Sequence, residues 1–249
     1  GRWHTSRAEY QRGLMDACCD PKNTEVVIMS AAQLGKSEAL LNMIGYHIDN
    51  DPSPILMLQP SLDMAQSFSK DRVANGLLAS TPCLKDKVKS PRARDSGNTT
   101  LHKTFAGGSI TLVGANSPSG LASRPVRLVL CDEVDRYPTS AGSEGDPIQL
   151  ARKRASTFWN RRIVMVSTPT NKGASRIEDA FEKSDQRRYY VPCQHCDHEQ
   201  TLRWANVQWV DSNPDTAQYQ CEECAALWSD ADRRRSIKEG KWVATAEFK

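Results

Sequence analysis

The segment VVIMSAAQLGKS, residues 26–37, is the most informative part of this sequence about its architecture. Its first four residues are apolar and mostly β-branched, a composition typical of a buried strand. The next eight match the phosphate-binding pattern G-x-x-x-x-G-K-[ST], except that Ser30 stands where the first glycine is expected. Apolar residues then recur at helical spacing over residues 36–48. The stretch therefore predicts a strand, an anion-binding loop and an amphipathic helix in succession.

The loop of this stretch can bind phosphate through its backbone. Gly35 permits a sharp turn, and exposed N–H groups at a helix N-terminus attract phosphate oxygens. Lys36 is expected to reach the β- and γ-phosphates of ATP, and the Ser37 hydroxyl is expected to bind Mg²⁺. An ordinary strand-to-helix turn with an exposed lysine is the alternative. The predicted phosphate cradle consists of Ser30, Ala31, Ala32, Gln33, Leu34, Gly35, Lys36 and Ser37.

A second apolar strand, residues 126–131, ends in two adjacent carboxylates, Asp132 and Glu133. Ligands of parallel α/β sheets gather at the carboxyl ends of the strands, where the loop and the carboxylates are both expected. Phosphoryl transfer needs a metal that neutralises oxygen charge and a group that aligns the nucleophile. We therefore expect Asp132 to bind Mg²⁺ and Glu133 to polarise the attacking water as general base. A plain surface Asp-Glu turn is the alternative, and the two motifs together favour an ATPase.

Four further residues carry side chains that suit a nucleotide site. Ser167 and Thr168 lie at the end of an apolar strand, where a hydroxyl can sense the γ-phosphate; a Ser/Thr/Pro turn is the simpler interpretation. The amide of Gln11 can pair with an adenine edge, although from the residues alone an exposed helix glutamine is the favoured explanation. Arg124 can donate to a γ-phosphate, in the first place that of a neighbouring subunit, or can equally be a structural arginine.

Strand and helix signals alternate along residues 1–188. This alternation predicts an α/β fold with a mostly parallel sheet and helices on both faces, of the P-loop NTPase (RecA/ASCE-like) type. Helices are expected at 7–17, 36–48, 61–76, 148–154 and 176–183. Strands are expected at 26–29, 55–58, 101–105, 109–113, 126–131 and 163–167, with loops at 80–100, 114–124 and 136–147. The sequence texture changes near residue 188, so a second, small domain is expected at 189–249.

This expected second domain contains two C-x-x-C pairs. Paired spacing in an intracellular chain favours a metal over disulfides, and four thiolates from two tight turns suit tetrahedral Zn²⁺. A closed four-thiolate shell has no open position, so we expect structural zinc in a zinc-ribbon-like module. His195 and His198 are expected to be bystanders. The four expected zinc ligands are Cys193, Cys196, Cys221 and Cys224.

Charge and hydropathy limit the class of protein. The formal net charge is +3, and basic residues cluster in residues 85–103, 152–162 and 233–235. Such clusters suit the phosphate backbone of DNA as well as ordinary solvated surface, and we expect the 85–103 loop to touch DNA. No stretch approaches the roughly 18 apolar residues of a membrane helix, and the N-terminus has no apolar signal core. We therefore expect an intracellular protein without a membrane partner.

Taken together, these motifs resemble the large terminase subunit of tailed bacteriophages, in its lambda-type branch. The resemblance implies an ATP-powered motor that packages double-stranded viral DNA into a procapsid in the host cell cytoplasm. It also implies a homo-oligomeric ring at a portal and a small terminase subunit as partner. The family pattern makes Gln11 an adenine contact, Ser167-Thr168 a coupling motif and Arg124 an arginine finger, and it supports the roles of the loop and the carboxylates. The matching segments are Tyr10-Gln11, residues 30–37, LVLCDEVDRYP at 128–138, Ser167-Thr168-Pro169 and the cysteine pairs.

Two departures from the family pattern stand out. Ser30 replaces a glycine in the loop, which affects the expected loop shape. Members of the family also carry a C-terminal nuclease domain, and residues 225–249 are too few to hold one. We therefore interpret the chain as an ATPase fragment and expect no DNA cleavage from it.

Three other protein classes share parts of this pattern. Residues 132–135 match the D-E-x-D box of superfamily-2 helicases, but those enzymes need a second RecA-like domain, for which residues 190–249 are too few and too rich in patterned cysteine. A zinc-ribbon nucleic-acid-binding module on an inert α/β scaffold would hydrolyse no ATP. A small-molecule kinase would need a substrate lid, and the sequence contains no recognisable one.

Overall fold

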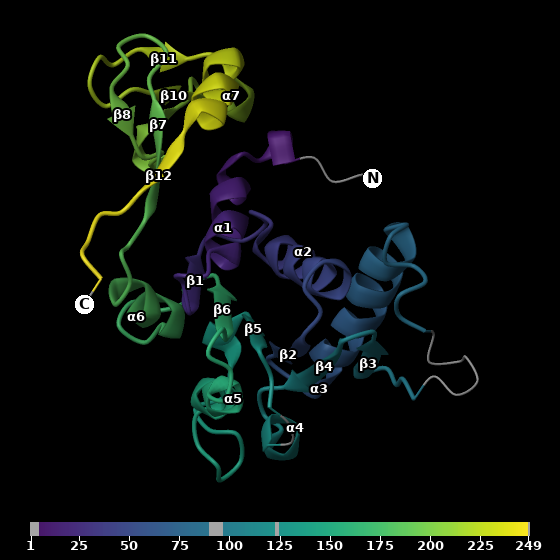
Figure 1. The fold of residues 1–249 in the computed structure, drawn as a ribbon. Coiled ribbons are helices and arrows are strands. Elements are labelled where there is room, and N and C mark those ends of the chain that lie inside the picture. Colours follow the sequence, from purple (N-terminus) through teal and green to yellow (C-terminus); the bar gives the residue numbers. More distant parts are fainter. Residues whose placement is uncertain (1–4, 90–96, 123–124, 249) are drawn as a thin grey trace. The chain divides into compact units, whose positions relative to one another are not determined.

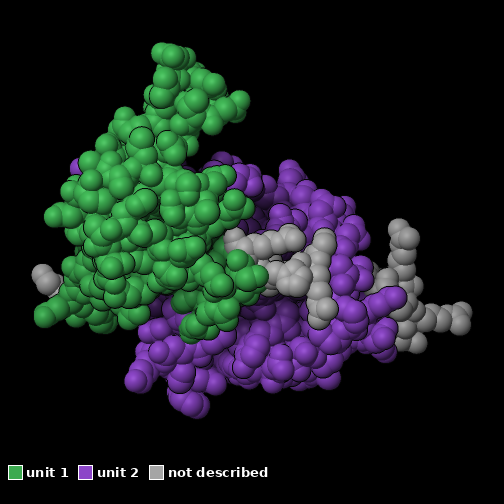
Figure 2. Space-filling model, turned by 90° about the horizontal axis from the view of Figure 1, so that it is seen from above, with its two compact units in different colours: residues 1–16, 182–249 green, residues 17–181 purple. Residues whose placement is uncertain are grey.

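The computed structural model describes residues 5–89, 97–122 and 125–248 (Figure 1). The chain divides into two compact units, residues 17–181 and residues 1–16 with 182–249 (Figure 2). The expected first domain was residues 1–188. In the structure, residues 1–16 instead group with residues 182–249. Trp242 Nε1 donates a hydrogen bond to the Tyr10 carbonyl at 2.8 Å, and the Tyr189 ring packs against both aromatic rings.

A six-stranded sheet forms the centre of the 17–181 unit, with the strand order β1-β6-β5-β2-β4-β3. All neighbouring strands are parallel except β3 and β4, which form an antiparallel hairpin at one edge. The expected α/β architecture with a mostly parallel sheet is therefore confirmed. The strands are β1 (Glu25–Met29), β2 (Pro54–Gln59), β3 (His102–Phe105), β4 (Gly108–Gly114), β5 (Leu128–Asp132) and β6 (Arg162–Ser167).

The helices of this unit follow the expected ones, with two differences. The helix expected at 61–76 begins as an α-helix, capped by the Ser61 hydroxyl, and continues as wider π-helical turns. The loop expected at 114–124 contains a short helix, α4. The helices are α2 (Lys36–Asp49), α3 (Leu62–Ser67), the π-helical η2 (Phe68–Leu78), α4 (Pro118–Ala122), the 3-10 turn η3 (Val134–Arg136), α5 (Pro147–Ala155) and α6 (Arg176–Glu182).

Apolar side chains cover both faces of the central strands. All five residues of β5 are buried, and alternate residues of a strand point to opposite faces of the sheet. On one face, Val129 and Cys131 pack in a cluster with Ile148 and Ala151 of α5. Leu128 and Leu130 point to the other face and are equally buried. Each such leucine contributes roughly 1.5–3 kcal/mol on burial, so both faces hold the sheet in place.

The unit formed by residues 1–16 and 182–249 contains two small antiparallel sheets, with strand orders β12-β7-β8 and β11-β10-β9. Its helix α7 (Asp230–Glu239) was not expected from the sequence, although the Ser229 hydroxyl and the Asp232 carboxylate form a capping box at its start. The remaining elements are η1 (Thr5–Arg7), α1 (Tyr10–Cys19), β7 (Arg188–Pro192), β8 (Glu199–Gln200), η4 (Trp204–Asn206), β9 (Val207–Gln208), η5 (Pro214–Thr216), β10 (Gln218–Gln220), β11 (Leu227–Trp228) and β12 (Lys241–Val243).

Over the residues that the structure describes, no helix is both long enough and apolar enough to cross a membrane.

Candidate active site

The loop between β1 and α2 runs through residues 30–35. Gly35 has φ 81° and ψ 19°, a left-handed conformation that glycine adopts without steric cost. The backbone N–H of Ser30 donates to the carbonyl of Ser167 at 3.3 Å, which ties the start of the loop to the end of β6. Ser30 does not have a positive φ, so a side chain at the position of the missing glycine creates no left-handed strain.

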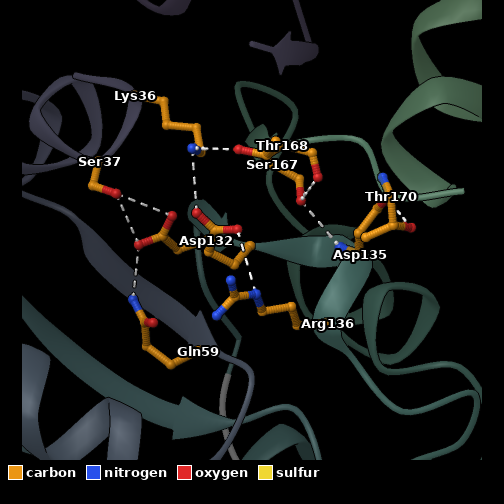
Figure 3. Close-up of polar contacts among 10 residues, drawn as sticks. Lys36, Ser37, Gln59, Asp132, Asp135, Arg136, Ser167, Thr168 and Thr170 are labelled. Atoms are coloured by element: carbon orange, nitrogen blue, oxygen red, sulfur yellow. Dashed lines mark hydrogen bonds and ion pairs between the residues drawn. The ribbon is translucent and has the colours of Figure 1, made fainter. Parts of the chain in front are cut away.

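Lys36 lies where three elements meet (Figure 3). It begins α2, and its buried Nζ donates to Thr168 Oγ1, just beyond β6, at 2.9 Å. The same Nζ lies 3.3 Å from Glu133 Oε1, just beyond β5. The predicted phosphate-binding lysine and the predicted general base are therefore direct neighbours. Because parallel strands end at one edge of the sheet, residues far apart in the sequence converge here.

Ser37 and Asp132 form a second pair beside Lys36. The Ser37 hydroxyl lies 3.3 and 3.2 Å from the two carboxylate oxygens of Asp132. Burial raises the pKa of Asp132, and a hydrogen bond from Gln59 opposes that rise. A hydroxyl and a carboxylate with converging oxygens are the hard donors that Mg²⁺ prefers, and a divalent cation favours the ionised form of the carboxylate. The donor set at this position therefore fits Mg²⁺.

Gln59 is a site residue that the sequence analysis missed. It ends β2, is buried, and its Nε2 donates to Asp132 Oδ2 at 3.2 Å. The amide therefore orients the carboxylate that faces Ser37. A signal for it existed, since Gln59 is a polar residue at the end of the apolar stretch 55–58, the position that Asp132 occupies on β5.

Glu133 has an unusual backbone conformation. Its φ of 54° and ψ of 50° place a non-glycine residue in the left-handed region, at a cost of about 1–3 kcal/mol. This conformation ends β5 abruptly and precedes η3. The Glu133 carboxylate is oriented between Lys36 and the guanidinium of Arg136, whose Nε lies 4.0 Å from Oε2 (Figure 3).

Asp135 joins the segments that follow β5 and β6. Its carboxylate accepts hydrogen bonds at 2.9 Å from Thr170 N, Thr170 Oγ1 and Ile177 N, and its own N–H donates to Ser167 Oγ at 3.3 Å. Burial raises the pKa of Asp135, but hydrogen bonds from Ile177, Ser175 and Thr170 outweigh it, so the net shift is downward. Asp135 thereby connects the predicted coupling residues to the start of α6. From the sequence, Asp135 was visible only as part of a D-E-x-D match and of the family-like segment 128–138, with no role of its own.

Three expected contacts have different outcomes. Gln11 belongs to the other unit, where it is buried rather than exposed, so its contact with adenine stays a prediction. Arg124 lies outside the described residues. The 85–103 loop, expected to touch DNA, is described except for residues 90–96. Its Lys103 is buried and donates to Ser69 Oγ and the Thr100 carbonyl at 2.7 Å each, so that lysine does not face a DNA backbone.

The four predicted zinc ligands lie together in the C-terminal part of the chain. Their sulfur atoms are all within 4.8 Å of one another. The Cys193–Cys224 and Cys196–Cys221 sulfurs are 3.9 and 3.8 Å apart. A tetrahedron with Zn–S bonds of about 2.3 Å has edges of about 3.8 Å, whereas a disulfide needs about 2.05 Å. The spacing therefore fits a four-thiolate zinc site.

Polar groups around the four sulfurs also suit thiolates. The backbone N–H of His195 donates to Cys193 Sγ at 3.4 Å, and Gln200 Nε2 donates to Cys221 Sγ at 3.2 Å. The imidazole of His195 lies near Asp232, and that of His198 lies near Glu222. The cluster of metal-binding atoms does not include these two histidines.

Comparisons with known proteins agree with this geometry. A family model described as "Phage terminase large subunit gpA, ATPase domain" matches residues 1–242. The large terminase subunit of Enterobacteria phage P21 is 27% identical over 254 residues, which cover 98% of this chain and 38% of that protein. The large terminase subunit of Escherichia phage lambda is 27% identical over 236 residues, which cover 91% of this chain and 36% of that protein. The chain thus spans less than two fifths of the length of these relatives.

Among solved structures, a mutant of the large terminase ATPase domain of Thermus phage P74-26 has a TM-score of 0.50 with this chain. It is 16% identical, and the match covers 81% of this chain and 78% of that one. At this level of identity the similarity shows a shared fold. The match of the family model over residues 1–242 shows more: this chain belongs to the family of phage terminase large subunit gpA ATPase domains.

Proposed function

We propose that this chain is the ATP-hydrolysing motor domain of a viral DNA-packaging terminase, with a P-loop NTPase fold. One observation carries the proposal: Lys36 Nζ lies 3.3 Å from Glu133 Oε1 at the carboxyl edge of a parallel sheet. A lysine at the start of a helix and a carboxylate at the end of a neighbouring strand can together enclose one triphosphate. Membership of the gpA ATPase-domain family supports this interpretation.

In this proposal each residue of the site has a role in phosphoryl transfer. The backbone of residues 30–37 and the Lys36 ammonium bind the phosphates. Ser37 and Asp132 hold Mg²⁺, which neutralises charge on the phosphate oxygens when bound. Glu133 accepts a proton from the attacking water. Thr168 Oγ1 accepts a hydrogen bond from Lys36 Nζ, and it loses this bond when the ammonium moves to contact a γ-phosphate.

Two contacts complete the proposed nucleotide site. Gln11 pairs with the adenine edge, because its amide can donate and accept at once. Arg124 acts as an arginine finger on the γ-phosphate of a neighbouring copy, where its charge stabilises the transition state. If so, turnover depends on the association of several copies.

The C-terminal segment has a structural role in this proposal. Residues 189–249 form a zinc-ribbon-like module in which four thiolates close the metal shell, so the zinc has no open position for chemistry. Residues 1–188 contain the ATPase machinery. The family relationship further suggests double-stranded DNA as the translocated substrate, a small terminase subunit and the portal of a procapsid as partners, a homo-oligomeric ring as the working form, and the host cell cytoplasm as the place of action.

DNA-stimulated ATP hydrolysis tests the proposal. The 249-residue chain with ATP and Mg²⁺ is expected to release phosphate, faster when double-stranded DNA is added. Turnover per chain is expected to rise steeply with protein concentration if Arg124 acts between copies. An inert scaffold would release no phosphate at any concentration, and a helicase would also displace a strand from a partial duplex. Either result would contradict the motor assignment.

Gln59→Leu is expected to weaken Mg²⁺ binding. Leucine has a similar size but no amide, so the buried Asp132 carboxylate loses a hydrogen-bond donor that orients it. Loss of such supporting partners typically costs 10–100-fold in metal affinity, and we expect the Mg²⁺ concentration for half-maximal hydrolysis to rise by about that factor. A variant with lower turnover and an unchanged Mg²⁺ requirement would show that Gln59 does not position Asp132.

A further inference from the structure

The C-terminal module exposes an aromatic surface that its zinc site does not explain. Trp204 is 78% exposed, Trp209 is 49% exposed, and the two ring centroids lie 6.1 Å apart. Val210, which follows Trp209 in the chain, is 62% exposed. Clustered large apolar side chains on a surface usually mark a contact with another molecule. We call the exposed surface of Trp204, Trp209, Val210, Asp211 and Asp215 the tryptophan face.

The loop that carries most of this face is well ordered by hydrogen bonds. Thr216 Oγ1 accepts from Val210 N at 2.9 Å and donates to the Asn213 carbonyl at 2.7 Å. Asp211 and Ser212 both have a positive φ, of 49° and 57°. Residues other than glycine rarely adopt a positive φ, and those that do are often found at functional sites. The loop therefore presents its tryptophan and its carboxylates in a fixed arrangement.

The charge of residues 193–228 disfavours an anionic ligand on this part of the module. Residues 193–228 contain six carboxylates and one basic residue, Arg203. Over the described part of the chain, no ion pair neutralises Asp211 or Asp215, whereas Glu199 pairs with Lys241. Four thiolates around Zn²⁺ would add two more negative charges. DNA binding depends on lysine and arginine at the phosphates, so the tryptophan face suits a cationic partner and repels a nucleic acid.

The 17–181 unit carries a surface of the opposite charge. Residues 147–163 contain five basic side chains and no carboxylate. Trp159 in this segment is 88% exposed. A hollow of about 390 Å³ in the same unit is lined by Glu25, Arg152, Lys153 and Arg161, among others, so three cations and one carboxylate, which pairs with Arg152, face it. We call the surface of Lys153, Trp159 and Arg161 with this hollow the basic face. The other basic cluster, on α7, shares its helix with two aspartates and a glutamate.

We propose that the tryptophan face of one copy docks on the basic face of a second copy of this chain. The protruding Trp204 ring inserts into the hollow, where Lys153 and Arg161 supply cation–π contacts. Asp211 and Asp215 complement the same cations. Because the two faces differ, the contact is heterologous, and it generates a ring or an open filament. The inference rests on the proposed assembly of several copies, but it does not require ATP hydrolysis.

Sedimentation velocity over a concentration series tests this contact in the 249-residue chain. The wild type is expected to associate as concentration rises, and the Trp204→Ala variant to need about thirtyfold more protein, the effect of losing one interface anchor. Phe248→Ala, which removes another exposed aromatic ring outside the face, is the matched control and is expected to associate as the wild type does. A monomeric wild type, or equal association of wild type and Trp204→Ala, overturns the proposal.

A charge exchange makes the test independent of folding defects. Lys153→Glu with Arg161→Glu makes the basic face acidic, and Asp211→Lys with Asp215→Lys makes the tryptophan face basic. Each double variant alone opposes like charges and is expected to stay monomeric. An equimolar mixture restores opposite charges at every contact and is expected to associate. A mixture that stays monomeric overturns the proposed contact, even if both variants hydrolyse ATP. A mixture that associates without hydrolysing ATP supports the contact and speaks against the motor assignment.

Discussion

Glu133→Gln is expected to lower ATP turnover by about 10²–10⁴-fold, the usual contribution of a general base. Glutamine has almost the same shape as glutamate, but its amide cannot accept the proton of the attacking water. The phosphate loop and Lys36 remain, so ATP binding is expected to persist. Phosphate release under saturating ATP and equilibrium binding of a fluorescent ATP analogue measure the two effects separately.

Glu144→Gln provides the matched control for this experiment. Glu144 is exposed in the loop before α5, and no described side chain pairs with its carboxylate. Its turnover is expected to equal that of the wild type. If Glu133→Gln retained full turnover, Glu133 would not be the base. If it also lost ATP binding, the effect would belong to the ion pair with Lys36 rather than to proton transfer.

Cys221→Ser is expected to abolish stable zinc binding and to unfold the C-terminal module. Cys221 is buried, and its sulfur accepts hydrogen bonds from Gln200 Nε2 and Glu223 N. Structural zinc contributes about 10–16 kcal/mol to the folding of small zinc modules, so the loss of one ligand leaves little to hold these short strands. Atomic absorption measures the zinc content, and amide hydrogen exchange locates the unfolding.

Cys83→Ser is the control for this change, since Cys83 is an exposed thiol of the 17–181 unit. It is expected to keep its zinc and its exchange protection. In Cys221→Ser, protection is expected to vanish from β7 through β12 and to persist in β1, β5 and β6, because the central sheet has its own core. A Cys221→Ser chain that still held one equivalent of zinc would rule out the four-thiolate site.

Short-range patterns explain which parts of this protein were predictable. The strand, loop and helix over residues 25–49 are encoded in one contiguous stretch, because apolar periodicity and a single glycine suffice to specify them. The carboxylates after β5 and the two cysteine pairs were equally recognisable, because the residues of each motif lie within four positions of one another in the sequence. The two α-helices that escaped prediction, α4 and α7, are a very short helix and one whose sequence is almost entirely polar.

The chemical groups of the site can be named from the amino-acid order alone: a lysine after a glycine turn, two carboxylates after a strand, and four thiolates in two pairs. Which of these groups meet, and which residues support them, follows from the folded arrangement of the strands and helices. The contacts of Lys36 with Thr168, of Gln59 with Asp132 and of Asp135 with Ile177 join residues from different strands and helices. Such pairings depend on strand order and register, which arise from the packing of the whole sheet and leave no local trace in the sequence.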